Sequence, residues 1–302
     1  MKTFFLSLIL FFFCKQIVAQ ELQVVSDSIM DNYMKTGFSN THFRPKGKTD
    51  KSGQRQGKWN DYEVVKTGSF FSIKNDPKEF LGTYLLYGEG AFVNGKRDGK
   101  WNLYIIEDKT FRKILSQKLA YVDGRPEGEF KFFYPDGNIA KTGNYKNGQI
   151  EGAATIYYQN GAVFGLQTYT EGKKEGLQKY YFPTGKKKSM VNYVAGKMNG
   201  KSETYYENGN IQESMEYTAD SADGNYRYYY SSGQLWTEKT YKDGMLMNVK
   251  AVYDKNGKEL DKGNLENGNG FVNFYTEEGK IYSKETFQNG RKIKEETFGE
   301  FH

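Results

Sequence analysis

The run Phe133-Tyr134-Pro135-Asp136-Gly137 decides the fold, because its pattern returns along the chain at steps of 24 residues. The pattern places an aromatic residue four positions before a glycine. Its later copies are Tyr157-Tyr158-Gln159-Asn160-Gly161, Tyr181-Phe182-Pro183-Thr184-Gly185, Tyr205-Tyr206-Glu207-Asn208-Gly209, Tyr229-Tyr230-Ser231-Ser232-Gly233, Tyr253-Asp254-Lys255-Asn256-Gly257 and, after a step of 22, Tyr275-Thr276-Glu277-Glu278-Gly279. A fixed period in this range is the sequence signature of a repeat architecture.

Two further positions keep the same period. One is a mostly aromatic position, occupied in turn by Tyr145, Tyr169, Tyr193, Tyr217, Tyr241, Leu265 and Phe287. The other is a Gly-x-x-x-Gly connector, as in Gly196 to Gly200, which shrinks to Gly268-Asn269-Gly270 in the last copy and so accounts for the two missing residues. Because loops tolerate deletions best, we expect this deletion to fall in a turn and to leave the strands intact.

Each unit contains two apolar-rich runs separated by two glycine-bearing turns, which is the sequence signal for consecutive β-hairpins. Pro135-Asp136-Gly137 and Asn160-Gly161 are strong turn signals of this kind. The sequence therefore predicts an all-β fold. We expect an elongated antiparallel meander of tandem β-hairpins, with about eighteen strands in a sheet large enough to twist strongly.

The type of turn decides which side chains share a face of the sheet. A two-residue turn at Asp136-Gly137 would place Tyr134 on the face of Ile139 and Tyr145, whereas a three-residue loop with a bulge at Gly137 would place Phe133 there. The Phe133 position is aromatic in all seven copies, but the Tyr134 position decays to Asp254 and Thr276. We therefore favour the bulged loop, with the Phe133, Ile139 and Tyr145 positions on one face.

The repeats divide the chain into segments. Residues 1–20 have an early lysine, a short apolar run and small residues near the expected cut, which is typical of a secretory signal peptide. Residues 21–52 form an N-terminal segment in which Leu22, Val25, Ile29 and Tyr33 have helical spacing, so a short helix is possible there. Residues 53–127 contain two irregular repeats with insertions, residues 128–291 seven regular ones, and residues 292–302 a C-terminal cap or tail. The signal peptide predicts export across the inner membrane, to the periplasm or the cell surface.

The composition gives little support for catalysis. The chain has two histidines, His42 and His302, and its single cysteine, Cys14, lies in the expected signal peptide. No serine or acid lies in a recognisable nucleophile motif, so we expect a protein that is not an enzyme and holds no cofactor. Asp254 and Asn256 resemble half of a calcium loop but lack the next ligand, and we expect no metal site.

The charge pattern bears on the class of partner. The formal net charge is +6, but lysines and glutamates are interspersed and do not form a basic stripe. Nucleic-acid binding requires clustered Lys and Arg, so we expect no nucleic-acid partner.

The segment Tyr193-Val194-Ala195-Gly196-Lys197-Met198-Asn199-Gly200 resembles the MORN-repeat variant of bacterial proteins labelled YwqK-family antitoxins. The resemblance covers about residues 53–290. It implies a β-hairpin repeat fold and, from the family label, an antitoxin or immunity role. Other MORN proteins are linked to membrane lipids or scaffolding, which the resemblance also implies here.

Rows of tyrosine are the candidate functional feature. Aromatic rows on a sheet suit binding of peptide segments or sugar rings, although tyrosine also fills thin, partly wet sheets. The residues of this aromatic ladder are Tyr157, Tyr181, Tyr205, Tyr229, Tyr169, Tyr193, Tyr217 and Tyr241. We expect a secreted or periplasmic scaffold that binds an unknown protein partner. The alternatives are binding of a cell-envelope glycan or lipid headgroup, and the antitoxin role.

Overall fold

The computed structural model describes residues 47–66, 83–106 and 112–298 of the chain. This part contains strands and turns, and none of its residues is helical, so the prediction of an all-β fold is confirmed. The expected signal peptide and N-terminal helix lie outside the described residues. No described helix is long and apolar enough to cross a membrane.

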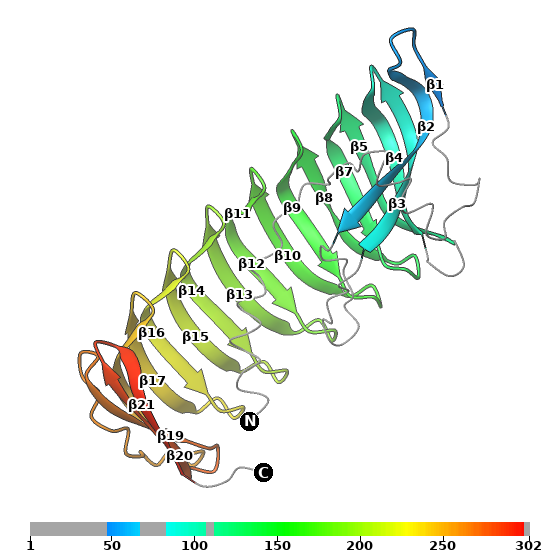
Figure 1. Cartoon of the computed structure of the whole chain (residues 1–302). Coiled ribbons are helices and arrows are strands. Elements are labelled where there is room, and N and C mark those ends of the chain that lie inside the picture. The colour runs from blue at the N-terminus through cyan, green and yellow to red at the C-terminus, as the bar shows by residue number, and fades with distance from the viewer. Residues whose placement is uncertain (1–46, 67–82, 107–111, 299–302) are drawn as a thin grey trace. The chain divides into compact units, whose positions relative to one another are not determined.

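The chain divides into two compact units, Met1–Ala162 and Val163–His302. In the first unit the strands pair antiparallel in chain order, as the successive arrows of Figure 1 show. They are β1 (Lys48–Thr49), β2 (Arg55–Lys66), β3 (Thr83–Val93), β4 (Lys96–Ile106), β5 (Lys113–Val122), β6 (Arg125–Pro126), β7 (Gly128–Phe133), β8 (Ile139–Lys146) and β9 (Gln149–Tyr157).

The second unit contains another antiparallel meander and a separate three-stranded sheet. The meander strands are β10 (Val163–Thr170), β11 (Lys173–Lys174), β12 (Gly176–Tyr181), β13 (Lys187–Val194), β14 (Lys197–Tyr205), β15 (Ile211–Thr218), β16 (Ser221–Tyr229), β17 (Leu235–Lys242) and β18 (Met245–Val252). The separate sheet contains β19 (Gly270–Tyr275), β20 (Ile281–Gln288) and β21 (Arg291–Thr297).

The first turn of each repeat is the expected three-residue loop. The Gly137 amide donates to the Tyr134 carbonyl at 2.9 Å, and the Tyr134 amide donates to the Asn138 carbonyl at 2.8 Å. Gly137 has a φ of 90°, in the left-handed region that a glycine bulge requires. The same two hydrogen bonds recur at the equivalent loops of later repeats. The prediction of a bulged loop is therefore confirmed.

The second turn is a two-residue turn with positive φ at both central residues, the type I′ geometry that suits a twisted hairpin. Asn147 and Gly148 have φ values of 51° and 83°. The Gly148 amide donates to the carbonyl of Pro126, one repeat earlier, at 2.9 Å. In the second unit Gly196 donates in the same way to Lys174, and Gly244 to Ala222. Hydrogen bonds between successive turns thus join neighbouring repeats at one end of their strands.

The prediction that Phe133, Ile139 and Tyr145 share one face is wrong for Tyr145. Phe133 does pair with Ile139, but Phe132 pairs with Lys141, so one extra residue of β8 enters between the two pairs. Because of this second bulge, the β8 residues that follow it point to the face opposite to the one that simple alternation predicts. Tyr145 therefore lies on the face of Phe132, opposite to Phe133.

The meander ends earlier than the repeats do. After β18 the chain forms only isolated bridges until β19 begins, so the expectation that the two-residue deletion leaves the strands intact is wrong. Asp261, Gly263 and Asn264 occupy the position of the missing strand, and these residue types are poor strand formers. The Asp261 carboxylate instead accepts the Gly263 amide at 2.9 Å and so favours a local turn.

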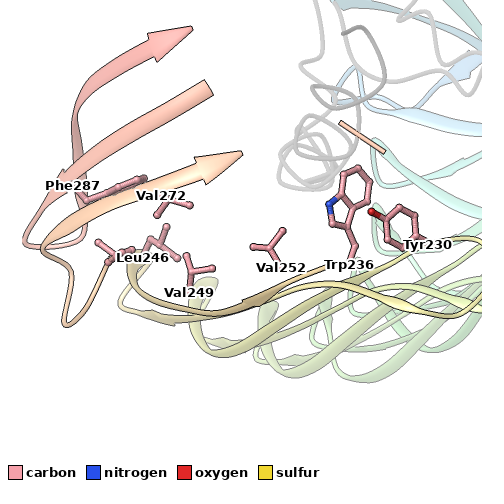
Figure 2. Close-up of a cluster of buried hydrophobic side chains, with 8 residues drawn as sticks. Tyr230, Trp236, Leu246, Val249, Val252, Val272 and Phe287 are labelled. Atoms are coloured by element: carbon pink, nitrogen blue, oxygen red, sulfur yellow. The ribbon is translucent and has the colours of Figure 1, made fainter. Parts of the chain in front are cut away.

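The two faces of each meander differ in burial. We call the face that carries Tyr145 and its equivalents in later repeats the inner face, and the opposite one the outer face. In the second unit these equivalents are Tyr169, Tyr193, Tyr217 and Tyr241. In the first unit a cluster on the inner face comprises Phe92, Trp101, Leu103, Leu119, Tyr121 and Phe130. In the second unit Trp236, Leu246, Val249 and Val252 lie on the concave side of the sheet, and Val272 and Phe287 of the C-terminal sheet face them (Figure 2). The C-terminal sheet therefore covers the inner face of β17 and β18.

Candidate functional site

The inner face of the second unit is polar along β10 to β14. Gln167, Gln178 and Ser202 are buried there, where the first unit has Trp101 and Leu103. Gln167 and Gln178 satisfy part of their hydrogen-bonding capacity within the sheet, as buried polar groups generally must. The next strands toward the C-terminus add half-buried charges to the same face. This chemistry distinguishes the region from an ordinary core.

A hydrogen-bond network orders the first part of this face. The Tyr169 hydroxyl donates to the Gln167 side-chain oxygen at 2.7 Å, and the Gln167 amide nitrogen donates to the Tyr180 hydroxyl at 2.9 Å. The Lys174 ammonium also donates to the Tyr180 hydroxyl, at 3.3 Å, and lies 5.0 Å from the centre of the Tyr193 ring. The network fixes three tyrosine rings and one cation in a row across β10 to β13.

Gln178 has a structural role within this face. Its side-chain oxygen accepts the Thr168 amide at 3.0 Å, and its side-chain nitrogen donates to the carbonyls of Glu175 at 2.9 Å and Gly176 at 3.1 Å. The side chain therefore pairs backbone groups that the bulge at Gly176 leaves outside the ladder. Because its polar atoms are used in this way, we assign Gln178 to the support of the site and not to ligand contact.

Lys188 is a cation on the same face without an anionic partner. It occupies the extra position of the bulge in β13, and its ammonium lies 5.7 Å from the centre of the Phe164 ring and 5.9 Å from that of Phe182. Burial lowers the pKa of Lys188. Within the described part of the chain, its ammonium has neither a hydrogen bond nor a carboxylate within 4 Å. Two aromatic rings thus hold a half-buried charge that the protein itself does not neutralise.

Glu213 and Lys239 are a second pair of half-buried charges, on β15 and β17. Burial raises the pKa of Glu213 to about 7, which the positive charge of Lys239 partly opposes. Burial lowers the pKa of Lys239 to about 8, and the negative charges of Glu285 and Glu213 partly oppose this shift. Among the described residues, neither side chain forms a hydrogen bond or an ion pair within 4 Å. The hydroxyl of Thr204, opposite Glu213, is also buried without a partner.

Tyrosine hydroxyls surround these charges. Burial, with a smaller contribution from the negative charge of Glu213, raises the pKa of Tyr217 to about 12. Burial raises the pKa of Tyr241 to about 12 as well, with the same contribution from Glu213. Both tyrosines are therefore neutral hydrogen-bonding groups at physiological pH. They suit recognition of polar ligand atoms better than acid–base chemistry.

The C-terminal sheet covers Lys239. The ring centre of Phe274 on β19 lies 4.8 Å from the Lys239 ammonium, and Glu285 on β20 contributes a negative charge. On the outer face, by contrast, some charges form ordinary ion pairs, such as that between Arg227 and Glu238 at 3.0 Å, and others, such as Lys179, are exposed to solvent. The half-buried charges Lys188, Glu213 and Lys239 all lie on the inner face.

The structure places the eight predicted tyrosines in two series on opposite faces. The series that precedes the first turn lies on the outer face, where Tyr205 is buried and Tyr157, Tyr181 and Tyr229 are partly buried. The second series lies on the inner face, where Tyr169 and Tyr193 are buried and Tyr217 and Tyr241 are partly buried. The second bulge separates the two series, as it does in the first unit.

No sequence motif identified Lys188, Glu213 or Lys239 as candidate site residues. A signal for Lys188 existed, since the residue at this bulge is Ala140, Phe164, Lys188, Gln212 or Trp236 in successive repeats, and the lysine is the one charge among them. Asp254, which resembles part of a calcium loop in the sequence, accepts amides of its own turn. The described residues contain no group of three or more metal-ligating side chains.

Comparisons with known proteins identify the repeat. The MORN repeat variant matches residues 126–147, 174–195, 198–219 and 222–243. MORN repeats generally mediate interactions with proteins or lipids. No curated protein gives a significant match.

Similar solved structures are remote. A GtfA/B complex bound to UDP and GlcNAc is 15% identical, with 52% of this chain and 28% of that one covered, at a TM-score of 0.18. A mutant Tc holotoxin pore of Photorhabdus luminescens is 11% identical, with 78% and 16% covered, at a TM-score of 0.16. The chain thus spans less than a third of either protein. The regions matched by the MORN repeat variant include much of the candidate face, from Lys174 to Tyr241, and identify the chain as one that contains MORN-type repeats.

Proposed function

We propose that this chain is a secreted or periplasmic scaffold that binds a protein partner on the inner face of its second unit. The observation that carries the proposal is the presence of two half-buried charges, Lys188 and Glu213, that have no hydrogen bond within the described structure. Unpaired charges removed from water destabilise a protein, so their presence in one region indicates a function other than stability.

The surroundings of these charges favour a protein partner. Tyrosine is enriched at protein interfaces because its ring packs against apolar groups while its hydroxyl forms hydrogen bonds. Here the rings of Tyr180, Tyr217 and Tyr226 line the same face as the charges. A repeated sheet presents such side chains at regular spacing, and it binds by adding modest contacts over several units.

The proposed location and role come from the sequence. The lysine and apolar run of residues 1–20 support export, and an exported scaffold would meet its partner in the periplasm or at the cell surface. An antitoxin or immunity role, which the family resemblance implies, would be one use of such a binding face. The proposal includes no catalytic step and no cofactor.

Site-specific photo-crosslinking tests the proposal. A photoreactive phenylalanine analogue would replace Tyr180 on the inner face or, as the matched control, its neighbour Lys179 on the outer face. In cells that make the protein, we expect a discrete protein adduct from position 180 and none from position 179. Equal adducts from both positions, or none from either, would contradict the proposal. An adduct that glycosidase removes and protease does not would support the glycan alternative instead.

A further inference from the structure

We infer that the inner face of β10 to β14 receives an extended acidic segment of a protein partner that also carries aromatic side chains, with a carboxylate against Lys188. The inference deepens the proposed function and rests on it. It is motivated by the charges on this face, the rings beside them, and the C-terminal sheet that covers the same face further along.

The charge on this part of the face has one sign. By the strand register, the inner-face side chains of β10 to β14 include Lys174 and Lys188 but no acid, and the first inner-face carboxylate is that of Glu213 on β15. Both lysines lie against aromatic rings, which confine their ammonium groups. A carboxylate of a partner would supply the ion-pair partner that the Lys188 ammonium lacks among the residues that the structure describes. Charge complementarity would exclude basic segments.

The C-terminal sheet shows what this face accepts. Over β17 and β18, a pair of extended strands places Phe274 on the Lys239 ammonium and the negative charge of Glu285 nearby. Val272 and Phe287 of the same strands pack with Leu246 and Val249. The inner face of this unit thus already binds extended strands that combine an acid with aromatic side chains, and we expect the strands beside it to accept a partner segment of the same chemistry.

Rings also distinguish this partner from a purely anionic one. Phe164 and Tyr180 lie 5.5 Å apart, centre to centre, beside Lys188. Such rings add contact energy for an aromatic side chain but little for a polyanion. We therefore expect acid and aromatic groups to be needed together.

The test measures binding of a fluorescent random copolymer of glutamate and tyrosine to the full chain, by polarisation at low and high salt. We expect Lys188→Gln to weaken binding about tenfold and Lys174→Gln to weaken it less, since loss of one charge-assisted contact has effects of this size. Lys179→Gln removes the same charge from the outer face of β12 and should change affinity less than about twofold. Circular dichroism verifies that each variant is folded.

Polyglutamate and heparin serve as comparison ligands, and we expect both to bind more weakly than the copolymer. Binding of either at equal strength would show that charge alone suffices and would overturn the aromatic part of the inference. Equal losses in Lys188→Gln and Lys179→Gln would overturn the assigned face. Absence of copolymer binding, with the protein adduct at position 180 retained, would overturn the acidic partner but leave the proposed function standing.

Discussion

The inner faces of the two units have the same backbone pattern but are lined by different side chains. In the first unit Trp101, Leu103 and Phe130 are each 1% exposed and form an apolar cluster. In the second unit the corresponding face carries glutamines, tyrosines and half-buried charges along β10 to β15. Because the turns are alike in both, the difference lies in the side chains and not in the hairpin geometry.

This contrast separates what builds a repeat from what a repeat can be used for. Hydrogen bonds between turns and the glycine bulges occur in both units, so they define the scaffold. The inner-face side chains vary from an apolar cluster to a polar surface without change in that scaffold. Where the variation leaves charges unpaired, we expect a cost to stability, and this expectation is the basis of the proposed binding face.

The largest expected effect tests the apolar cluster. Trp101→Ala should reduce the free energy of unfolding by about 3–5 kcal/mol, because it removes a side chain that is 1% exposed from the cluster. Urea denaturation followed by circular dichroism measures the loss. Leu177→Ala, at an outer-face position that is 45% exposed, is the control and should cost less than about 0.5 kcal/mol. Similar losses in both variants would mean that the inner face is not the core.

The next effect concerns the charges of the second unit. Glu213 has its pKa raised from 4.5 to about 7 in the folded state, so the folded protein binds the proton more tightly than the unfolded chain. Its contribution is fully present below pH 4.5 and is lost as the pH rises to about 7. We expect a loss of about 3 kcal/mol over this window.

Glu213→Gln provides the comparison for this pH dependence. The neutral amide should abolish the loss between the two pH values and raise stability at pH 8. Denaturation midpoints across the pH range measure both. An unchanged pH profile in the variant would show that Glu213 is solvated and does not belong to a buried site.

A pair of glycines sharpens the comparison between the units. A Cβ at Gly143 would lie 2.8 Å from the Phe130 ring, which is confined in the apolar cluster, so Gly143→Ala should cost about 2 kcal/mol. A Cβ at Gly165 would lie 3.0 Å from the ring of Tyr180, which is partly exposed but held by hydrogen bonds to its hydroxyl. Gly165→Ala should therefore cost about 1 kcal/mol, less than Gly143→Ala. Thermal unfolding compares the two, and the reverse order would argue against the rigid packing assigned to the first unit.

The smallest expected effect should be the same in both units. The Tyr134 hydroxyl donates to the Tyr157 carbonyl at 2.6 Å, and the Tyr206 hydroxyl to the Tyr229 carbonyl at 2.7 Å, each joining neighbouring repeats. Tyr134→Phe and Tyr206→Phe should each reduce stability by about 1 kcal/mol. Differential scanning calorimetry on both variants checks the equality. A large loss in one unit alone would show that these bonds are not a shared part of the scaffold.

The scaffold was predictable from the sequence because glycine marks its turns. Gly137 and its equivalents fixed the period and the bulged loop, and the repeat predicted an antiparallel meander. The assignment of faces failed because the second bulge, at Ala140 and its equivalents, has no common residue type. The separation of the last three strands from the meander was likewise not predicted, although Asp261 and Gly263 interrupt the strand pattern before them.

The candidate site was predictable only in outline. The sequence singled out the tyrosine rows, and part of those rows does lie on the inner face. It did not identify Lys188 or Glu213, because burial of a charge depends on the fold of neighbouring strands and not on local spacing. The strand register is what places these two side chains on the inner face.

The most direct test of the account is the stability of Lys188→Met, measured as the urea midpoint against that of the original protein. Methionine keeps the length and apolar stem of lysine but needs no counter-charge. If Lys188 is retained for binding at a cost to stability, the midpoint should rise, by an amount equivalent to about 1 kcal/mol, because a buried unpaired charge is removed. A midpoint that falls would show that the lysine stabilises the sheet through its aromatic neighbours, and would contradict the claim that this face is kept for a partner.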